Sequence, residues 1–353
     1  MPLKISEHQL QRFESLYKKY KTMYQDPARS RPLFLINVEQ EPLNDWHKRF
    51  EDPALMLQRE LESLETHLLL EDDYTPTVRV QFGTVQVAAA FGTELDIPPD
   101  NYPTYKDHIL KSRQDIARLE EPALNTPLLQ KLAAFTAYFK EHLPDGIHIQ
   151  HPDIQSALNT AHILRGTAVF MDFYDDPAMI DKLLDIITAY MIKLVPYLKK
   201  MISNDREWFF DWGGLWKGRA RISNCSAQMI SPELYTAHIL PRDIQLMHAI
   251  GGGRMHYCGT SYAVIERFFE NPLISAIDFD GSVHDLFQIA LKAPDRTILF
   301  TGGRYNDALI QKLLAGEWPA KRNLVLKVTV PDIKTGKKVL NQLRQKAATA
   351  YNN

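Results

Sequence analysis

The sequence predicts an α/β fold: a (β/α)8 TIM barrel with an N-terminal helical extension. Short apolar segments alternate with stretches of helical periodicity from residue 33 onward, which is typical of a parallel sheet. Eight such segments can be counted, and eight favours a closed barrel over an open doubly wound sheet. No G-x-G-x-x-G follows the first segment, which argues against the dinucleotide-binding form of the open sheet.

The expected elements follow in chain order. Residues 1–30 have helical periodicity and form the expected extension, and residues 31–353 form a single barrel domain. A second helix is expected over 43–70, where leucines recur near helical spacing. The predicted strands are 33–38, 77–82, 146–151, 220–225, 253–258, 274–279, 297–302 and 323–329. Helical patterns lie between them, for example at 176–201, 232–249, 283–292 and 306–315.

Composition and charge exclude several classes of protein. With 41 basic and 43 acidic side chains the net charge is −2, so we expect no nucleic-acid partner. No segment approaches the roughly 18 apolar residues of a membrane span, so we expect no membrane association. The two cysteines cannot form a disulfide framework, and the N-terminus lacks an apolar signal region. A reduced, cytoplasmic protein is the expectation.

Alternation within the strands indicates where a site lies, because one face of a barrel strand meets the outer helices and the other faces the lumen. The apolar set expected to point outward is Phe34, Ile36, Val78, Val80, Ile147, Ile149, Met255, Tyr257, Ile277, Phe279, Ile298, Phe300, Leu324, Leu326 and Val328. The polar set expected in the lumen is Asn37, Glu39, Arg79, Gln81, His148, Gln150, Ser223, Cys225, His256, Cys258, Asp278, Asp280, Thr301, Lys327 and Thr329. So many polar groups facing one lumen predict a site at the C-terminal mouth.

Some of these polar side chains have a structural interpretation as well. Arg79, Arg221 and Arg254 fall early in their strands, where they are either part of the site or structural pairs at the lower rim. Asp278 and Asp280 share a face, as acid–base work or metal ligation needs, but a salt bridge to Arg304 or Lys327 is the alternative.

Two loops near the predicted strands offer further candidates. The segment 301–304 (TGGR) follows the seventh strand, where barrels often hold anions, although a tight Gly-Gly turn needs no ligand. The aromatic run 207–216 (EWFFDWGGLW) precedes the fourth strand. It forms either a pocket for a flat ligand, with Asp211 as polar anchor, or ordinary loop packing.

A metal site is suggested by His256-Tyr-Cys258 at the end of the fifth strand. Residues two apart on a strand point the same way, so the imidazole and the thiolate can converge on one ion, and zinc favours these ligands. The alternative is that the cysteine is a buried free thiol, which is common.

The segment 222–260 (ISNCSAQMISPELYTAHILPRDIQLMHAIGGGRMHYCGT) resembles the uroporphyrinogen decarboxylase superfamily, most of all its cobalamin (corrinoid)-dependent methyltransferase branch. That branch has a similar I-S-P stretch, a helix, and then a strand ending in H-x-C-G. Supporting matches are 151–177, 80–95 and the final strand and helix, so the resemblance covers most of the chain after residue 75. It implies a (β/α)8 barrel, in agreement with the strand count.

By this resemblance His256 and Cys258 are zinc ligands, and the zinc activates a thiol. The family's third ligand is a cysteine near 329–331, where this chain has Thr-Val-Pro. Cys225 ends the neighbouring fourth strand and can replace it, giving a Cys225–His256–Cys258 site with an open position. The alternative is that Cys225 is a small apolar filler and that His256 bonds to an acid in the lumen.

The function expected from the resemblance is a zinc-dependent methyltransferase that moves a methyl group between a small substrate or thiol and a corrinoid protein. A separate corrinoid protein is expected because the chain lacks the D-x-H-x-x-G cobalamin-binding motif. The expected catalytic residues are His256, Asp278 and Asp280. The expected substrate-binding residues are Asn37, Gln81, Gln150, Asp211, Asn224 and Arg304. Barrels of this family often pair, so a homodimer is one expected assembly.

Two other functions stay open. The first strand lacks the family's arginine-rich R-Q-A-G-R loop, which makes uroporphyrinogen a poor candidate substrate. A metal-free decarboxylase of a smaller carboxylic acid, with Arg304 or Lys327 holding the carboxylate, is the main alternative. A binding protein that kept the barrel and lost turnover is the third.

Overall fold

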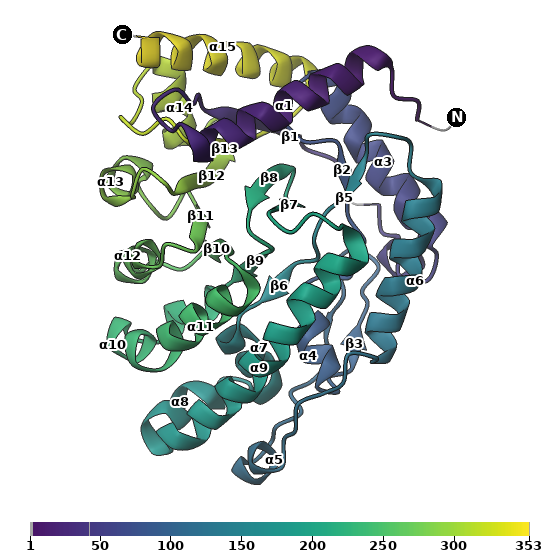
Figure 1. Cartoon of the computed structure of the whole chain (residues 1–353), viewed down its shortest axis with the longest axis vertical. Helices are drawn as coiled ribbons and strands as arrows, with labels where there is room; N and C mark the ends of the chain where they lie inside the picture. The colour runs from purple at the N-terminus through teal and green to yellow at the C-terminus, as the bar shows by residue number, and fades with distance from the viewer. Residues whose placement is uncertain (1–2, 42, 353) are drawn as a thin grey trace.

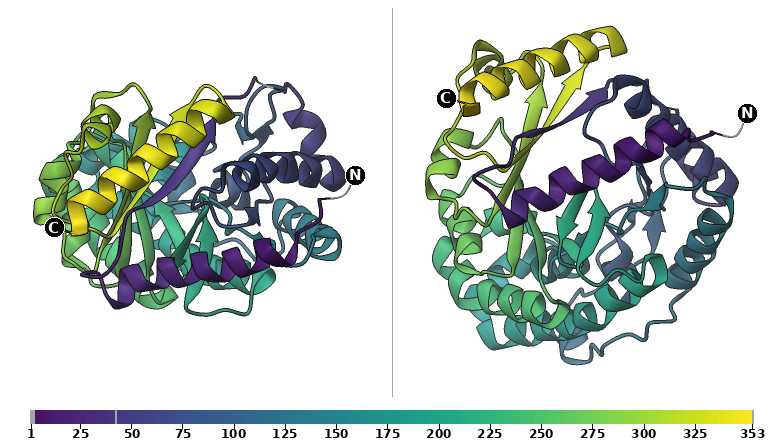
Figure 2. Two further views of the ribbon diagram at one scale, coloured as in Figure 1. Left: turned by 90° about the horizontal axis from the view of Figure 1, so that it is seen from above. Right: turned by 45° about the horizontal axis from the view of Figure 1, so that its top comes forward.

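A parallel barrel enclosed by helices forms the body of the protein, as Figures 1 and 2 show for this computed structural model. The structure describes residues 3–41 and 43–352. Its barrel strands are β1 (Leu33–Val38), β2 (Thr77–Val78), β5 (His148–Ile149), β6 (Ile154–Gln155), β9 (Ala220–Ser223), β10 (Gly253–Tyr257), β11 (Ile274–Phe279), β12 (Ile298–Arg304) and β13 (Leu324–Val330). Two antiparallel pairs lie outside this sheet, namely β3 (Leu95–Asp96) with β4 (Thr104–Tyr105) and β7 (Trp208–Asp211) with β8 (Gly214–Lys217).

The helices fall before, between and after these strands. They are α1 (Glu7–Gln25), α2 (Trp46–Arg49), α3 (Pro53–Leu70), α4 (Gln86–Ala90), α5 (Arg113–Ala117), α6 (Pro127–His142), α7 (Ala157–Arg165), α8 (Ala168–Asp175), α9 (Pro177–Ile202), α10 (Pro232–Leu234), α11 (Leu240–Ile250), α12 (Tyr262–Glu270), α13 (Leu286–Lys292), α14 (Ala308–Ala315) and α15 (Ile333–Asn352). A 3-10 turn spans Cys225–Met229, and a π-helical turn spans Tyr235–Ile239. No helix in the described part of the chain is long and apolar enough to cross a membrane.

Parallel pairing confirms the predicted barrel. One sheet has the strand order β1-β13-β12-β11-β10-β9-β6, and β2 pairs with β5 in a second. Strands β5 and β6 are two pieces of a single barrel position, interrupted at residues 150–153, so the strands fill the eight positions that the sequence predicts. The interruption lets β5 pair with β2 and β6 pair with β9.

Side chains replace the backbone ladder between β1 and β2. The carboxylate of Asp73 accepts the backbone N–H of Phe34 at 3.0 Å, and that of Asp72 accepts the N–H of Ile36 at 2.7 Å. In turn Asp73 donates its own N–H to the carbonyl of Phe34 at 2.8 Å. Buried backbone groups need partners, and these two carboxylates supply them because β1 and β2 do not pair with each other.

Strand β2 is shorter than the predicted 77–82 for a related reason. Beyond its second residue, the N–H of Arg79 donates to the carboxylate of Glu60 at 2.8 Å, and the N–H of Gln81 donates to the Met56 sulfur at 3.3 Å. Both acceptors belong to α3. The helix thus binds the end of the strand and pulls it out of regular pairing.

The hairpin β7–β8 lies inside the barrel, where Figure 1 shows it between the strands and α1. Its two turn residues, Trp212 and Gly213, have φ angles of 46° and 72°, which correspond to a two-residue turn with both residues left-handed. A Cβ on Gly213 would lie 2.2 Å from the Tyr74 ring, so only glycine fits there. The run 207–216, predicted as an aromatic loop, is therefore a hairpin whose side chains fill the lumen.

Two apolar clusters follow from this arrangement. The larger lies between the strands and the outer helices, and the smaller lies in the lumen, where Trp216 packs on Tyr20 of α1 and on Phe300. The prediction that Ile298 and Phe300 point outward is wrong. Their pairing with Ala276 and Asp278 in β11 puts them on the lumen face, and apolar residues fill both faces at that level.

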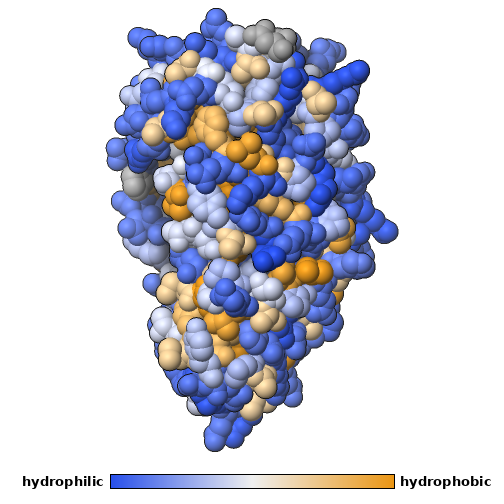
Figure 3. Space-filling view, turned by 90° about the vertical axis from the view of Figure 1, so that its left-hand side faces the viewer, coloured by the Kyte–Doolittle hydropathy of each residue, from blue (hydrophilic) through white to orange (hydrophobic). Residues whose placement is uncertain are grey.

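The face that carries α12, α13 and α14 is polar, with several separate apolar patches (Figure 3). Leu291 of α13 is 85% exposed. Scattered apolar side chains are ordinary on a folded surface, so this face lends no support to the expected homodimer.

Candidate active site

Three adjoining cavities open at the C-terminal mouth of the barrel and share the side chain of Trp212. Their volumes are about 220, 300 and 370 Å³. The first also involves Arg79 and Lys327, the second Lys327 and His256, and the third Arg79 and Asp153. Trp212 is half-buried, and its ring has the guanidinium groups of Arg79 and Arg221 at 5.2 and 5.8 Å and the Lys327 ammonium at 5.0 Å. An indole face surrounded by cations is the floor of the site.

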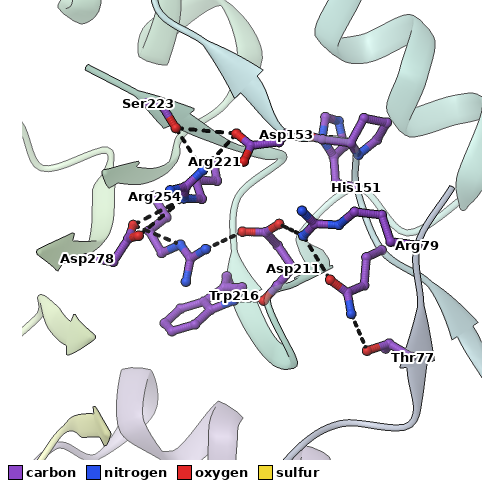
Figure 4. Close-up of polar contacts among 12 residues, drawn as sticks. Thr77, Arg79, His151, Asp153, Asp211, Trp216, Arg221, Ser223, Arg254 and Asp278 are labelled. Atoms are coloured by element: carbon purple, nitrogen blue, oxygen red, sulfur yellow. Dashed lines mark hydrogen bonds and ion pairs between the residues drawn. The ribbon is translucent and has the colours of Figure 1, made fainter. Parts of the chain in front are cut away.

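Buried ion pairs cross the lumen beneath this floor (Figure 4). The carboxylate of Asp211, at the tip of the hairpin, accepts hydrogen bonds from Arg79 of the first half of the barrel and Arg254 of β10. Arg79 also donates to the side chain of Gln150 at 2.8 Å, and Gln150 donates to Thr77 at 2.9 Å. These contacts fix the hairpin tip in the lumen.

Asp278 is the centre of the second half of the network. It accepts Arg221 Nε at 3.2 Å and His256 Nδ1 at 2.6 Å, and Arg254 Nε lies 3.4 Å away. Burial alone would raise the pKa of this carboxyl, but Arg221 and the other cations outweigh it and hold the pKa well below the ordinary value. Arg221 also donates to Asp153 at 2.7 Å. Asp278 is thus an anion that orients His256.

Three metal-ligating side chains meet at the edge of the mouth. Ligand atoms of Cys225, His256 and Cys258 all lie within 4.8 Å of one another. Because the Asp278 bond occupies Nδ1 of His256, its Nε2 is the nitrogen left for a metal. Hydrogen bonds from Cys225 and His256 lower the pKa of the Cys258 thiol to about 5 and so favour its thiolate, whereas Cys258 and burial raise the pKa of Cys225.

Strand ends supply these ligands, though not quite as predicted. His256 lies on β10 and Cys258 just beyond it, but β9 ends at Ser223, and Cys225 begins the 3-10 turn that follows. The turn is tied down because Asn224 donates its N–H to the carbonyl of His256 at 2.9 Å. The fold therefore brings together the three ligands that were predicted from an incomplete family motif.

Lys327 and Glu60 face the smallest of the three cavities. Lys327 is half-buried and makes no ion pair or hydrogen bond through its ammonium within the described ranges. Burial and the nearby Arg79 lower its pKa. Burial raises the pKa of Glu60 to about 7, against the opposing hydrogen bond from the Arg79 N–H. The cavity thus holds a cation without a partner and a carboxyl that titrates near neutrality.

The predicted substrate-binding residues divide into two groups. Asn37, Gln81 and Gln150 line the mouth cavities. Asp211 is fully buried in ion pairs with two arginines, so its role in this structure is to hold the lumen together. Asn224 is fully buried behind the metal-ligating group, where it accepts from Ser156 at 2.9 Å and donates to Asp243 at 2.6 Å.

Two other predicted residues lie at the rim. Asp280 is exposed and accepts the N–H and hydroxyl of Ser282, which ends the strand in a turn. Arg304 is exposed and paired with Glu39. Its glycine neighbours serve the packing of the chain, since a Cβ on Gly302 would lie 1.9 Å from the carbonyl oxygen of Lys327.

Several residues of the site were not predicted from the sequence. Trp212 was one of five aromatics in a run, and Asp153 and Glu60 carried no signal in their segments. The hairpin could have been found, because two alternating aromatic stretches flank a W-G-G segment of turn-forming residues. The side chain that each arginine pairs with is set by three-dimensional packing and has no local pattern.

Comparisons with known proteins agree with this architecture. The family model for uroporphyrinogen decarboxylase (URO-D) matches residues 45–302, most of the chain. The chain belongs to the uroporphyrinogen decarboxylase family. A solved methyltransferase from Methanosarcina mazei has a similar fold, with a TM-score of 0.68 and 15% identity over 95% of this chain and 99% of that one. A comparison with curated proteins finds no match.

Membership of the uroporphyrinogen decarboxylase family confirms the resemblance seen in the sequence and the TIM barrel. At 15% identity the likeness to the methyltransferase speaks for the fold alone. Fold does not fix reaction, and the chemistry must be argued from the mouth of the barrel.

Proposed function

We propose that this protein is a methyltransferase of the corrinoid-dependent type, moving a methyl group between a small thiol substrate and a corrinoid held by a partner protein. The observation that carries the proposal is the convergence of Cys225, His256 and Cys258 beside the mouth cavities. Two sulfurs and one imidazole nitrogen, with a fourth position open, are the donor set of a catalytic zinc site. The URO-D fold and the fold of the methyltransferase from Methanosarcina mazei support the same direction.

The donor set fits zinc on chemical grounds. His256 donates Nδ1–H to Asp278 and thereby presents a neutral Nε2, as metal-bound histidines commonly do. Cys258 is the thiol most readily ionised. Zinc bound by these three residues would lower the pKa of a substrate thiol and make it a better nucleophile.

The remaining residues bind and orient. Trp212 provides a flat apolar floor, and Gln81 offers an amide group at its edge, whereas the amide of Gln150 is bound to Arg79 and Thr77. Asp278 keeps His256 in one orientation, and the buried arginines keep Asp278 ionised. Reactants held in one geometry need less ordering in the transition state, which is the contribution expected of this part of the site.

The test is the metal content of purified protein, measured by inductively coupled plasma mass spectrometry. We expect about one zinc ion per chain in the wild type and in Thr260→Ser, an exposed neighbour that offers no ligand to the group. Cys225→Ser and Cys258→Ser should each lose most of the metal. Wild-type protein that takes up no zinc when the ion is supplied would overturn the metal site.

Methyl transfer is measured separately, with free methylcobalamin and a small thiol in place of the natural partners. The wild type should demethylate methylcobalamin faster than Cys258→Ser, as followed by the visible absorbance of the corrinoid. Equal rates in the two proteins, with zinc present in the wild type, would contradict the proposed reaction while leaving the metal site standing.

Lys327 favours one alternative, a decarboxylase of a small carboxylic acid. A half-buried ammonium that lies over Trp212 and makes no ion pair with the described residues is suited to a carboxylate. Arg304, the other residue predicted for this role, is already paired with Glu39. This function would be supported by a protein whose activity is indifferent to chelators and to Cys258→Ser but is lost in Lys327→Met.

A further inference from the structure

A further cavity, called here the base cavity, lies at the end of the barrel opposite the three mouth cavities. Its volume is about 470 Å³, larger than any of the three mouth cavities. Its walls come from α1, β5, the C-terminal end of α9 and the strand β7 of the hairpin. Nothing in the proposed reaction uses it.

Aromatic rings form one wall of the base cavity. The rings of His148 and Phe210 are stacked, with centroids 4.7 Å apart and planes inclined by 14°. Tyr17 of α1 meets the His148 ring edge-on at 5.8 Å. His148 is exposed at this wall, and the loss of water around its ring lowers its pKa, which favours the neutral ring as a flat aromatic surface. Such a wall suits a planar ring as ligand.

A buried lysine without a partner forms another part of the lining. Lys199, in the last turn of α9, is 6% exposed and faces this cavity. Within the described residues its ammonium makes no ion pair or hydrogen bond. The charge of Asp205 favours the ammonium and that of Arg219 opposes it, and the Asp205 carboxylate already accepts the N–H groups of Glu207 and Trp208 at 2.8 and 2.9 Å. A buried cation is costly without a counter-charge, so the site is built for an anion.

The charge of the whole lining points the same way. Three lysines line the base cavity, namely Lys18, Lys21 and Lys199, against the two carboxylates of Glu14 and Asp205. The ammonium of Lys21 also lies 5.5 Å from the Trp208 ring. The lining therefore has an excess of positive charge around apolar walls.

We propose that the base cavity binds a small aromatic anion, a planar ring bearing a carboxylate. The ring lies against the His148–Phe210 stack, and the carboxylate pairs with Lys199. The hairpin separates this ligand from the mouth, since Trp208 and Phe210 face the base cavity and Trp212 faces the mouth. The ligand is thus a second molecule, distinct from the substrate, and the proposal is independent of the reaction at the mouth.

The experiment uses naphthalene-2-carboxylate as probe and isothermal titration calorimetry on the full chain. We expect Lys199→Met to weaken binding about tenfold or more, because it removes the charge and keeps the length of the side chain. Lys200→Met, which changes the exposed neighbour on the same helix, should bind as the wild type does. Lys199→Arg should restore most of the affinity. Circular dichroism of each variant checks that the fold is kept.

Two further measurements can overturn the proposal. The neutral naphthalene-2-carboxamide should bind more weakly than the carboxylate to the wild type and equally to wild type and Lys199→Met. If the carboxylate binding is lost in Lys327→Met and kept in Lys199→Met, then the probe sits at the mouth and the proposal fails. No measurable binding of the carboxylate to the wild type would also refute it.

Discussion

The two ends of the barrel lumen are built from the same hairpin but hold different chemistry. At the mouth, the tip of the hairpin places Asp211 among arginines, and nearly every charged group there has a partner of opposite charge. At the base, β7 and β8 present aromatic side chains, and α1 closes the lumen over them. The hairpin before β9 therefore places paired charges at one end of the lumen and aromatic side chains at the other.

The two ends show which charged side chains are held in place by the stability of the fold and which are free to bind a ligand. Arginines at 0 to 5% exposure persist in a lumen only because carboxylates neutralise them. Lys327 at the mouth and Lys199 at the base lack such partners in the described structure. At these two lysines we expect a ligand to supply the opposite charge.

The largest effect should follow from Asp211→Asn. The substitution leaves Arg79 and Arg254 buried without the charge that both contact, so we expect a loss of about 4 kcal/mol in the free energy of unfolding. Urea denaturation followed by circular dichroism measures it. Asp175→Asn removes an exposed partner of Arg113 and should cost less than about 1 kcal/mol. Equal losses in the two variants would show that the buried network does not stabilise the fold.

The two tryptophans of the hairpin should separate stability from activity. Trp216 is fully buried on Phe300 and Arg254, so Trp216→Ala should cost about 3 kcal/mol of unfolding free energy. Trp212 is half-buried at the mouth, so Trp212→Ala should cost about 1 kcal/mol and lose most of the methyl-transfer activity. Denaturation midpoints and methylcobalamin assays test the contrast. Activity retained in Trp212→Ala would show that the Trp212 side chain does not bind the substrate.

Glu60 should make the stability of the mouth depend on pH. Its pKa in the folded chain is about 7, above the ordinary 4.5, so its stabilising contribution is complete below pH 4.5 and lost as pH rises through 7. Glu60→Gln has no such dependence and should exceed the wild type by about 2 kcal/mol at pH 8. Denaturation at pH 5 and pH 8 measures the difference. Glu65→Gln, on the same helix but exposed, should leave the wild-type pH dependence unchanged.

The smallest effect is expected at the rim. Arg304 and Glu39 form an exposed pair, so Arg304→Gln should lower the unfolding free energy by about 0.5 kcal/mol or less. The methylcobalamin assay should show little change, because the guanidinium is already occupied by Glu39. A large rise in the substrate concentration needed for half-maximal rate would instead return Arg304 to the substrate site.

The barrel could be predicted because its strands carry their own signals. Segments 33–38 and 274–279 are strands with the predicted bounds, since both are apolar runs flanked by breakers. The meeting of His256 with Cys258 could be inferred because alternation along a strand places side chains two apart on one face, whereas Cys225 reaches them from the 3-10 turn after β9. Apolar runs and alternation within a strand are local patterns, so they can be recognised in a single sequence.

The rest depended on packing between distant segments. The outward prediction for Phe300 failed because the lumen at its level is filled by Trp216, whose hairpin was not predicted. Asp211 looked like a substrate anchor because its arginine partners lie 132 and 43 residues away in the chain. Partners of this kind have no spacing rule, so only the fold identifies them.

The hairpin also has a consequence for how the chain folds. Asp211 binds Arg79 from the first half of the barrel and Arg254 from the second, while its own strand precedes β9. Arg79 of the first half is neutralised by the hairpin, which is also tied to β10 of the second half. We therefore expect closure of the barrel and filling of its lumen to be a single cooperative event, in which a separated half-barrel remains a loosely ordered chain.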